Sequence, residues 1–176
     1  MSPERLSTPR YCQECGHFLV ERWVEAERRS RLQCENCGFI HYMNPRVVVS
    51  IIVEHQGKVL LQERANEPRA GFWTFPGGFL EIGELPEEGA RRETLEEVEL
   101  DVIPSVLQGV YGRADAGIVL VVYNGESASD DARVTDPESR QVRWYAVGEI
   151  PWADLAFDTT EAALRDWVRM RSEASS

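Results

Sequence analysis

Three glutamates, Glu93, Glu96 and Glu97, are spaced so that one face of a helix would carry all of them. At 3.6 residues per turn they fall within an arc of about 100°. Like charges at this spacing destabilise an isolated helix, and acids near its carboxyl end oppose the helix dipole. A divalent cation would resolve this conflict, because carboxylate oxygens suit Mg²⁺ or Mn²⁺. A solvated acidic face is the alternative for the three glutamates taken alone.

The acidic charge of the chain is concentrated around these glutamates. The 176 residues include 19 Lys and Arg against 30 Asp and Glu, a formal net charge of −11. The window 81–101 holds nine acids and two bases, and therefore carries −7 of that charge. The overall balance argues against a basic surface for nucleic acid, so a nucleic-acid partner is not expected. An anionic small substrate would need metal ions or local arginines to approach this window.

Four cysteines form a second group with chemical potential. Cys12-x2-Cys15 and Cys34-x2-Cys37 are separated by 18 residues, the spacing of a two-knuckle zinc site. Four thiolates can surround Zn²⁺ tetrahedrally and leave no open coordination position, so the site would be structural. Disulfides, free thiols and a catalytic redox pair are the alternatives. A reducing compartment and the lack of a βαβ context disfavour them.

The window from Gly78 to Leu100 resembles the Nudix box, G-x5-E-x7-R-E-U-x-E-E-x-G-U, where U is a bulky apolar residue. The matching positions are Gly78, Glu84, Arg92, Glu93, Glu96, Glu97 and Leu100. Thr94 stands at an apolar position of the box. Glu99 replaces the glycine that normally ends the helix in a left-handed conformation, which leaves an extended helix as one outcome.

The resemblance implies a fold and an activity. Nudix hydrolases have an α/β/α sandwich with a mixed β-sheet, and they cleave the pyrophosphate of a nucleoside diphosphate linked to a further group. In the family, the glutamates matching Glu93, Glu96 and Glu97 bind Mg²⁺ or Mn²⁺. One of these glutamates, or a glutamate in a later loop, activates the attacking water.

The resemblance also implies roles for residues around the metal. Arg92 would pair with a box glutamate and orient it, and Glu84 would support the constellation or ligate. The backbone carbonyl of Gly78 would complete the metal shell. Glu138 is the candidate for the loop glutamate.

Motifs outside the box resemble the zinc-ribbon Nudix proteins related to ADP-ribose and FAD pyrophosphatases. They lie at 41–46, 64–78 and 155–157. ADP-ribose or FAD is ranked above NADH, because the downstream signature of NADH pyrophosphatases and their large preceding domain are missing. A hydrolase of NAD-type RNA ends and a non-catalytic nucleotide sensor are further alternatives, although a sensor has no need of intact box glutamates. Family members are often homodimers, so the resemblance implies a homodimer.

Four side chains are candidates for substrate contacts, each with a structural alternative. Arg64 suits a phosphate, or it forms a surface ion pair with Glu63 or Glu67. Aromatic rings can stack on adenine or fill the core, and the core interpretation is favoured by the dominance of aromatics in packing. The aromatic candidates are Trp73, Phe75 and Tyr111.

Periodicity and turn residues predict a flexible tail at 1–10, a zinc ribbon at 11–45, a Nudix domain at 46–171 and a second tail at 172–176. Strands are expected at 47–53, 58–63, 73–75, 102–111, 118–123 and 141–147, with a turn at Gly77-Gly78. Helices are expected at 86–98, with Thr94, Leu95 and Val98 facing the core, and at 159–171. The segment 124–140 is a polar loop prone to disorder. No apolar stretch approaches the length of a membrane span and no signal core is visible, so a cytoplasmic location is expected.

Overall fold

The computed structural model describes residues 8–174, so the predicted tails at 1–10 and 172–176 lie partly outside the described residues. The chain divides after Pro45 into two compact units, which are described separately. None of the helices in the described range is long and apolar enough to cross a membrane.

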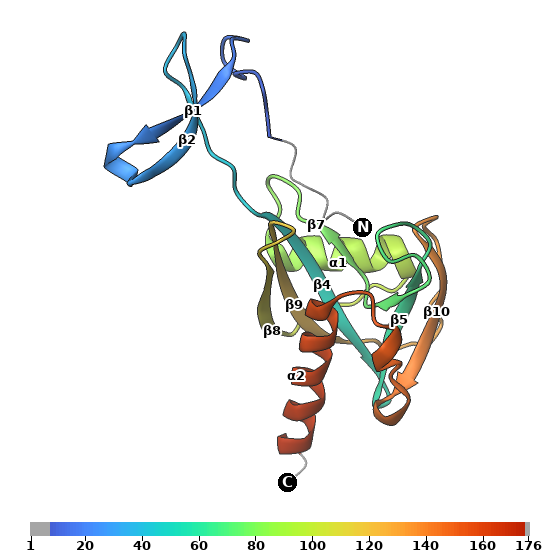
Figure 1. Cartoon of the computed structure of the whole chain (residues 1–176). Helices are drawn as coiled ribbons and strands as arrows, with labels where there is room; N and C mark the ends of the chain where they lie inside the picture. Colours follow the sequence, from blue (N-terminus) through green and yellow to red (C-terminus); the bar gives the residue numbers. More distant parts are fainter. Residues whose placement is uncertain (1–7, 175–176) are drawn as a thin grey trace. The chain divides into compact units, whose positions relative to one another are not determined.

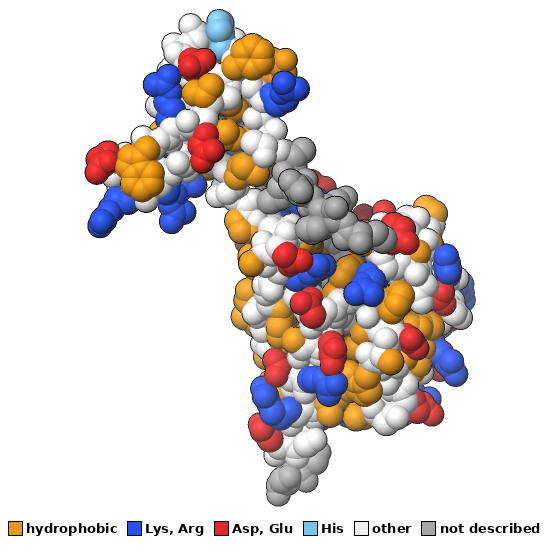
Figure 2. All heavy atoms as spheres, in the orientation of Figure 1, with side chains coloured by type: hydrophobic (Ala, Val, Ile, Leu, Met, Phe, Trp, Pro, Cys, Tyr) orange, Lys and Arg blue, Asp and Glu red, His pale blue; other side chains and the backbone are white. Residues whose placement is uncertain are grey.

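The N-terminal unit is a small three-stranded antiparallel sheet. Its strands are β1 (Leu19–Val24), β2 (Arg29–Cys34) and β3 (Ile40–His41), in that order, and η1 (Glu25–Glu27) joins the first two. Apolar side chains are exposed on this unit beside arginines (Figure 2). They include Tyr11, Phe18 and Trp23. Because so little apolar surface is buried here, other interactions must hold the unit together.

A mixed sheet forms the centre of the second unit (Figure 1). Its main path runs β10-β5-β4-β9-β8, β6 pairs with β5, and β7 pairs with β4. The β4–β9 pairing is parallel and the others are antiparallel. The strands are β4 (Arg46–His55), β5 (Lys58–Arg64), β6 (Trp73–Thr74), β7 (Gly77–Phe79), β8 (Val106–Arg113), β9 (Ile118–Glu126) and β10 (Ser139–Ala146).

Each face of this sheet is covered by one helix. Alternate side chains of a strand point to opposite faces. On β4, Ile52 packs in one cluster with Trp167 of α2 (Asp158–Ala174), whereas Ile51 packs in the other with Val98 of α1 (Pro86–Val98). The predicted α/β/α sandwich with a mixed sheet is confirmed. Two short turns, η2 (Val147–Glu149) and η3 (Trp152–Asp154), lead into α2.

Several predicted elements differ from the observed ones. The expected Gly77-Gly78 turn is strand β7, because glycine lets the backbone lie against β4: a Cβ on Gly77 would come within 1.9 Å of Ser50 Oγ. Strand β8 begins only at Val106, beyond Pro104. Helix α2 continues to Ala174, past the predicted end at residue 171.

The sequence predicted the range of α1 correctly and one of its faces incorrectly. Thr94 and Val98 are buried, but Leu95 is 46% exposed. The buried arc is centred on Ala90, Thr94 and Val98, and Leu95 lies about 100° away from it. Glu99 does not extend the helix. It adopts the left-handed conformation itself, with φ 57°, and its N–H bonds to Leu95 O.

Candidate active site

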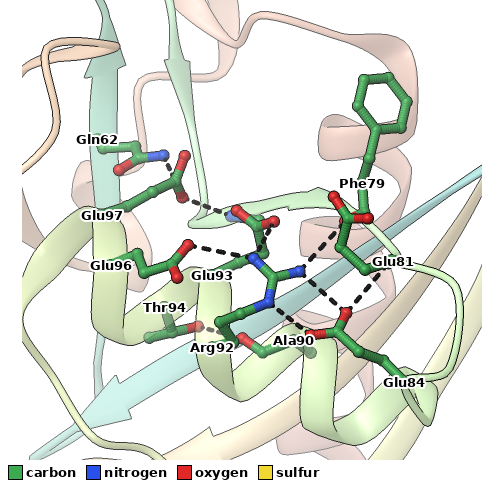
Figure 3. A network of polar contacts seen from close by, with 11 residues as sticks. Gln62, Phe79, Glu81, Glu84, Ala90, Arg92, Glu93, Thr94, Glu96 and Glu97 are labelled. Atoms are coloured by element: carbon green, nitrogen blue, oxygen red, sulfur yellow. Dashed lines mark hydrogen bonds and ion pairs between the residues drawn. The ribbon is translucent and has the colours of Figure 1, made fainter.

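Helix α1 carries the acidic residues of the box. Two features favour the start of the helix: Pro86 occupies its first position, and the N–H of Leu85 donates to the side chain of Glu88. The helix packs against β4 through Ala90 and Val98. This packing leaves Glu93 facing β7, and Glu97 facing β7 and Gln62 of β5 (Figure 3).

Arg92 is the centre of the acidic network in Figure 3. Its guanidinium group makes two hydrogen bonds with Glu84, at 2.6 and 3.0 Å, and bonds to Glu93 at 2.7 Å and to Glu96 at 3.1 Å. It also donates to Phe79 O at 3.3 Å. The bonds to Glu84 in particular raise the pKa of Arg92. The same contact, together with the N–H of Glu81, lowers the pKa of Glu84 to about 2.

Glu97 lies apart from Arg92, in a buried position. Its side chain is 8% exposed, and one oxygen, Oε2, accepts bonds from Gly77 N at 2.7 Å and from Gln62 Nε2 at 2.9 Å. Burial raises the pKa of Glu97 to about 8, against the effect of these two donors. The charges of Glu93 and Asp136 push the pKa in the same upward direction.

Glu93 lies between these two groups, against β7. A Cβ on Gly78 would come within 2.4 Å of the Glu93 carboxylate, so the backbone of β7 closes directly on this side chain. Burial raises the pKa of Glu93, although its bond to Arg92 acts in the opposite direction. Two partly desolvated carboxylates therefore face the same strand, Glu93 at Gly78 and Glu97 at Gly77.

The loop between β9 and β10 binds the carboxyl end of α1. Thr135 donates from its N–H to Glu97 O and from its hydroxyl to Glu96 O, and Arg133 N–H donates to Val98 O. These bonds satisfy carbonyls that a helix end otherwise leaves open. The segment that the sequence marks as prone to disorder is thus tied to the helix that carries the glutamates.

Two residues of this site were missed from the sequence, and one predicted residue is placed differently. Asp136 is half-buried and its charge acts on Glu97, whereas Glu138 is exposed and its N–H bonds to Asp136. Gln62, on β5, donates a hydrogen bond to Glu97. The sequence could have indicated Gln62, because it is a polar residue at the end of the apolar run Val59–Leu61.

The donor set fits a hard divalent cation in an open site. Among residues 8–174, only the four cysteines bring three or more candidate ligand atoms within 4.8 Å of one another, so the glutamate oxygens do not form a closed cage. Mg²⁺ keeps several waters and is usually bound by one or two carboxylates together with substrate phosphates. Carboxylates spread along one helix face, beside backbone carbonyls of β7, provide such a set.

The four cysteines form a compact cluster in the N-terminal unit. All four are free, and Sγ–Sγ distances are 3.7 Å for Cys12–Cys37, 3.4 Å for Cys15–Cys34 and 3.5 Å for Cys15–Cys37. Four sulfurs held tetrahedrally at 2.3 Å from one ion would be about 3.8 Å apart. A backbone hydrogen bond from His17, followed by bonds from neighbouring thiols, lowers the pKa of Cys15 to about 6. The cluster therefore has the geometry of a four-thiolate metal site.

The three aromatic candidates for substrate contacts belong to or pack against one core cluster, on the α2 side of the sheet, and most of the candidates have structural partners. Phe75 is 3% exposed and lies in the core, as the packing alternative predicts. Trp73 packs edge-to-face on Tyr145, and Tyr111 donates to Asp166 of α2 at 3.0 Å. Arg64 does not make the suggested ion pair. It donates to Pro68 O at 3.0 Å and lies over the ring of Phe157.

Comparisons with known proteins identify the same fold. A mixed sheet between two helices, with the acidic box on one helix, defines a class of nucleotide hydrolases. Residues 43–168 match the NUDIX domain family, and residues 10–43 match the family described as Nudix N-terminal, a zinc ribbon. The chain belongs to the Nudix family and is a Nudix hydrolase, as the sequence predicted.

Three groups of relatives illustrate the range of the match. An ADP-ribose pyrophosphatase from Methanocaldococcus jannaschii is 36% identical over 143 residues, which cover 74% of this chain and 78% of that protein. A MutT-like protein from Streptomyces ambofaciens is 36% identical, covering 58% of this chain and 64% of the relative. Proteins from Haemophilus influenzae named NAD-capped RNA hydrolase NudC are 24% identical over 80% of this chain, which spans about half (53%) of their length.

Solved structures show the same fold. The crystal structure of a Nudix hydrolase from Nitrosomonas europaea has a TM-score of 0.88 and 36% identity, and covers 94% of this chain and 93% of its own. The Nudix domain of Shewanella oneidensis NrtR, solved with ADP-ribose, has a TM-score of 0.62 at 23% identity over 73% of this chain and 90% of its own. The second likeness is one of fold alone.

The burial of Glu97 predicts a pH dependence of stability in metal-free protein. The folded state keeps the Glu97 proton up to about pH 8, whereas an ordinary glutamate loses it near 4.5. The folded state therefore binds the extra proton between these values, and this contribution to stability falls as pH rises through that window. Glutamine does not ionise, so Glu97→Gln lacks this loss of stability with rising pH. The unfolding free energy of the variant minus that of the wild type should therefore increase between pH 5 and pH 8.5.

Urea unfolding in EDTA at both pH values measures the difference in unfolding free energy between the two proteins. A difference that stays constant with pH would contradict the burial of an ionisable Glu97.

Proposed function

We propose that this chain hydrolyses the pyrophosphate bond of a nucleoside diphosphate linked to a further group, with ADP-ribose or FAD as substrate and AMP as one product. The observation that carries the proposal is the position of Glu97, buried and held by the N–H of Gly77 beside Glu93. The alternative, a solvated acidic face, would not bury a carboxylate, because burial costs the free energy of desolvating it.

A divalent cation is the partner that such carboxylates need. The proposed ions are Mg²⁺ or Mn²⁺, which suit oxygen ligands. When bound, the cation supplies Lewis-acid activation of a phosphoryl oxygen and lowers the pKa of a bound water. The residues proposed to hold it are Glu93, Glu96 and Glu97, with the backbone carbonyl of Gly78, a residue that lies against the Glu93 carboxylate.

Arg92 is proposed to act on these ligands rather than on the substrate. Its five N–H donors are divided among three carboxylates and Phe79 O, so it fixes Glu93 and Glu96 from one side. Glu84 holds Arg92 in place through two bonds. This arrangement leaves a fixed carboxylate surface, which an anionic diphosphate can approach once cations are bound.

The loop acid is proposed to be Asp136 in place of Glu138. Thr135 ties the loop to the backbone of Glu97, and the neighbouring Asp136 acts on the Glu97 charge. Glu138 is exposed, and its backbone atoms are used to hold Asp136 and Ala65. A carboxylate beside the metal ligands can accept a proton from the attacking water, a role that requires proximity before any particular pKa.

Zn²⁺ is proposed for the four cysteines. Thiolates at these sulfur separations match its tetrahedral preference, and a closed set of four ligands is structural. The ion would supply the stability that the small apolar core of the N-terminal unit cannot.

The names of relatives support ADP-ribose first and an NAD-type RNA end second. The relative of which this chain covers 78% is named an ADP-ribose pyrophosphatase, whereas the chain spans about half of the proteins named NAD-capped RNA hydrolases. NADH and a non-catalytic sensor are the remaining alternatives. A homodimer and a cytoplasmic location stay predictions from the sequence.

A substrate panel tests the activity. With Mg²⁺ or Mn²⁺, the protein is expected to release AMP from ADP-ribose or FAD faster than it releases AMP from NADH or nicotinamide mononucleotide from NAD-capped RNA. Glu97→Gln should lower kcat by at least about 100-fold, because a metal ligand is lost. Chromatography of the nucleotide products measures both results. Binding of ADP-ribose without AMP release would point to a sensor, and near-normal kcat in Glu97→Gln would refute the site.

The loop acid is tested by a matched pair of variants. Asp136→Asn should lower kcat by about 10-fold or more, because the carboxylate near Glu97 is lost, whereas Glu138→Gln should leave kcat within about twofold. Steady-state kinetics at saturating Mg²⁺ compare the two. The opposite order would return the role to Glu138.

Elemental analysis tests the ribbon. Protein purified under reducing conditions should contain one zinc per chain, and Cys12→Ser or Cys34→Ser should lose it, because either change removes one of four ligands. A metal-free protein with an intact N-terminal unit would contradict the zinc assignment.

A further inference from the structure

Gln62 is a buried polar side chain in an apolar part of the sheet. It follows Val59, Leu60 and Leu61 on β5, all fully buried, and is itself 3% exposed. Leu60 packs in the cluster on the α1 side, and residues two apart share a face, so Gln62 faces the same helix. A leucine or valine at this position would continue the pattern of the strand.

The amide of Gln62 is used to hold Glu97. Its Nε2 donates to Glu97 Oε2 at 2.9 Å, and the N–H of Gly77 donates to the same oxygen at 2.7 Å (Figure 3). Both donors therefore hold one oxygen of the carboxylate, from two different strands. The carboxylate cannot turn about its axis without breaking both bonds, which leaves Oε1 as the oxygen free to take a further partner.

The other end of the same amide has no partner. Gln62 Oε1 is buried and makes no hydrogen bond among the described residues. Turning the amide over does not relieve this, because it would place one acceptor against the Glu97 acceptor oxygen. Native proteins leave few buried polar atoms unsatisfied, and such an atom calls for an explanation. An apolar side chain of the same size would avoid the unsatisfied atom and would give up only the bond to Glu97 Oε2, which keeps the N–H of Gly77.

We propose that Gln62 is a positioning residue for the metal site, which fixes Glu97 so that a single oxygen, Oε1, is presented to the cation. The inference rests on the proposed function, since it takes Glu97 as a metal ligand. Gln62 itself touches neither cation nor substrate. Residues that orient metal ligands in this way commonly control metal affinity by 10–100-fold, which explains why an unsatisfied amide is retained.

Gln62→Met and Gln62→Leu test the inference, because both keep the size of the side chain and remove the donor. Either variant should weaken Mn²⁺ binding by about 10–100-fold, read as free Mn²⁺ by electron paramagnetic resonance without substrate. The Tm of the metal-free variants in EDTA should equal or exceed that of the wild type, since the unsatisfied oxygen is gone. At subsaturating Mn²⁺, kcat should fall and be restored by excess Mn²⁺, with KM little changed.

Leu60→Met is the matched control, because Leu60 lies on the same strand and the same face but its apolar side chain makes no hydrogen bond to Glu97. It should bind Mn²⁺ as the wild type does. Mn²⁺ affinity within twofold of the wild type in both Gln62 variants would overturn the inference, as would an equal loss in Leu60→Met. A lower Tm with unchanged affinity would assign Gln62 to packing alone. Glu97→Gln distinguishes a failure of the Gln62 inference from a failure of the proposed metal site. If this variant binds Mn²⁺ normally, the proposed metal site itself is wrong.

Discussion

A single guanidinium group holds the acidic side of this molecule together. Nine acids lie within 21 residues, and Arg92 makes contact with three of them at once. Without the guanidinium charge, Glu93 and Glu96 would repel each other on α1, and both would repel Glu84 in the loop that precedes the helix. Their geometry therefore depends on Arg92, and the helix, strand β7 and the loop that carries Glu84 are arranged around its donors. The net charge of −11 is less informative than the clustering of acids in residues 81–101 and the pairing of three of them with Arg92.

Glu97 depends on a different support. It is held by backbone and amide donors instead of by an opposite charge, so no cationic side chain of residues 8–174 compensates for its burial. The close approach of β7 to β4 makes this possible, and that approach requires glycine at 77. The loop at 133–136 adds support at the carboxyl end of the helix, where Glu97 itself lies. Glu93 and Glu97, on consecutive turns, are thus held in different ways. Glu93 is bonded to Arg92, whereas Glu97 has no cationic partner among the described side chains.

The sequence predicted those parts of the molecule in which residue spacing alone determines the geometry. The box glutamates share a helix face because of helical periodicity, and the two cysteines within each Cys-x2-Cys pair lie close because of their spacing. Residues that meet through the sheet were not predicted. Gln62 is 35 positions from Glu97, and Asp136 is 39 positions away, so strand order decides both contacts. The same limitation explains Leu95, whose exposure depends on the angle at which α1 packs on β4. For Glu99, tertiary contacts of the helix end overcome a residue type that disfavours the left-handed conformation.

We propose that the carboxylates around Arg92 and Glu97 form a binding site for the cations used in diphosphate hydrolysis. Diffraction from crystals soaked in MnCl₂ would locate these cations through the anomalous signal of manganese. We expect an anomalous peak within ligand distance of Glu97, on the side of Oε1, and of Glu93. A peak elsewhere in the domain, or none at Glu97 under conditions in which the protein hydrolyses its substrate, would contradict it.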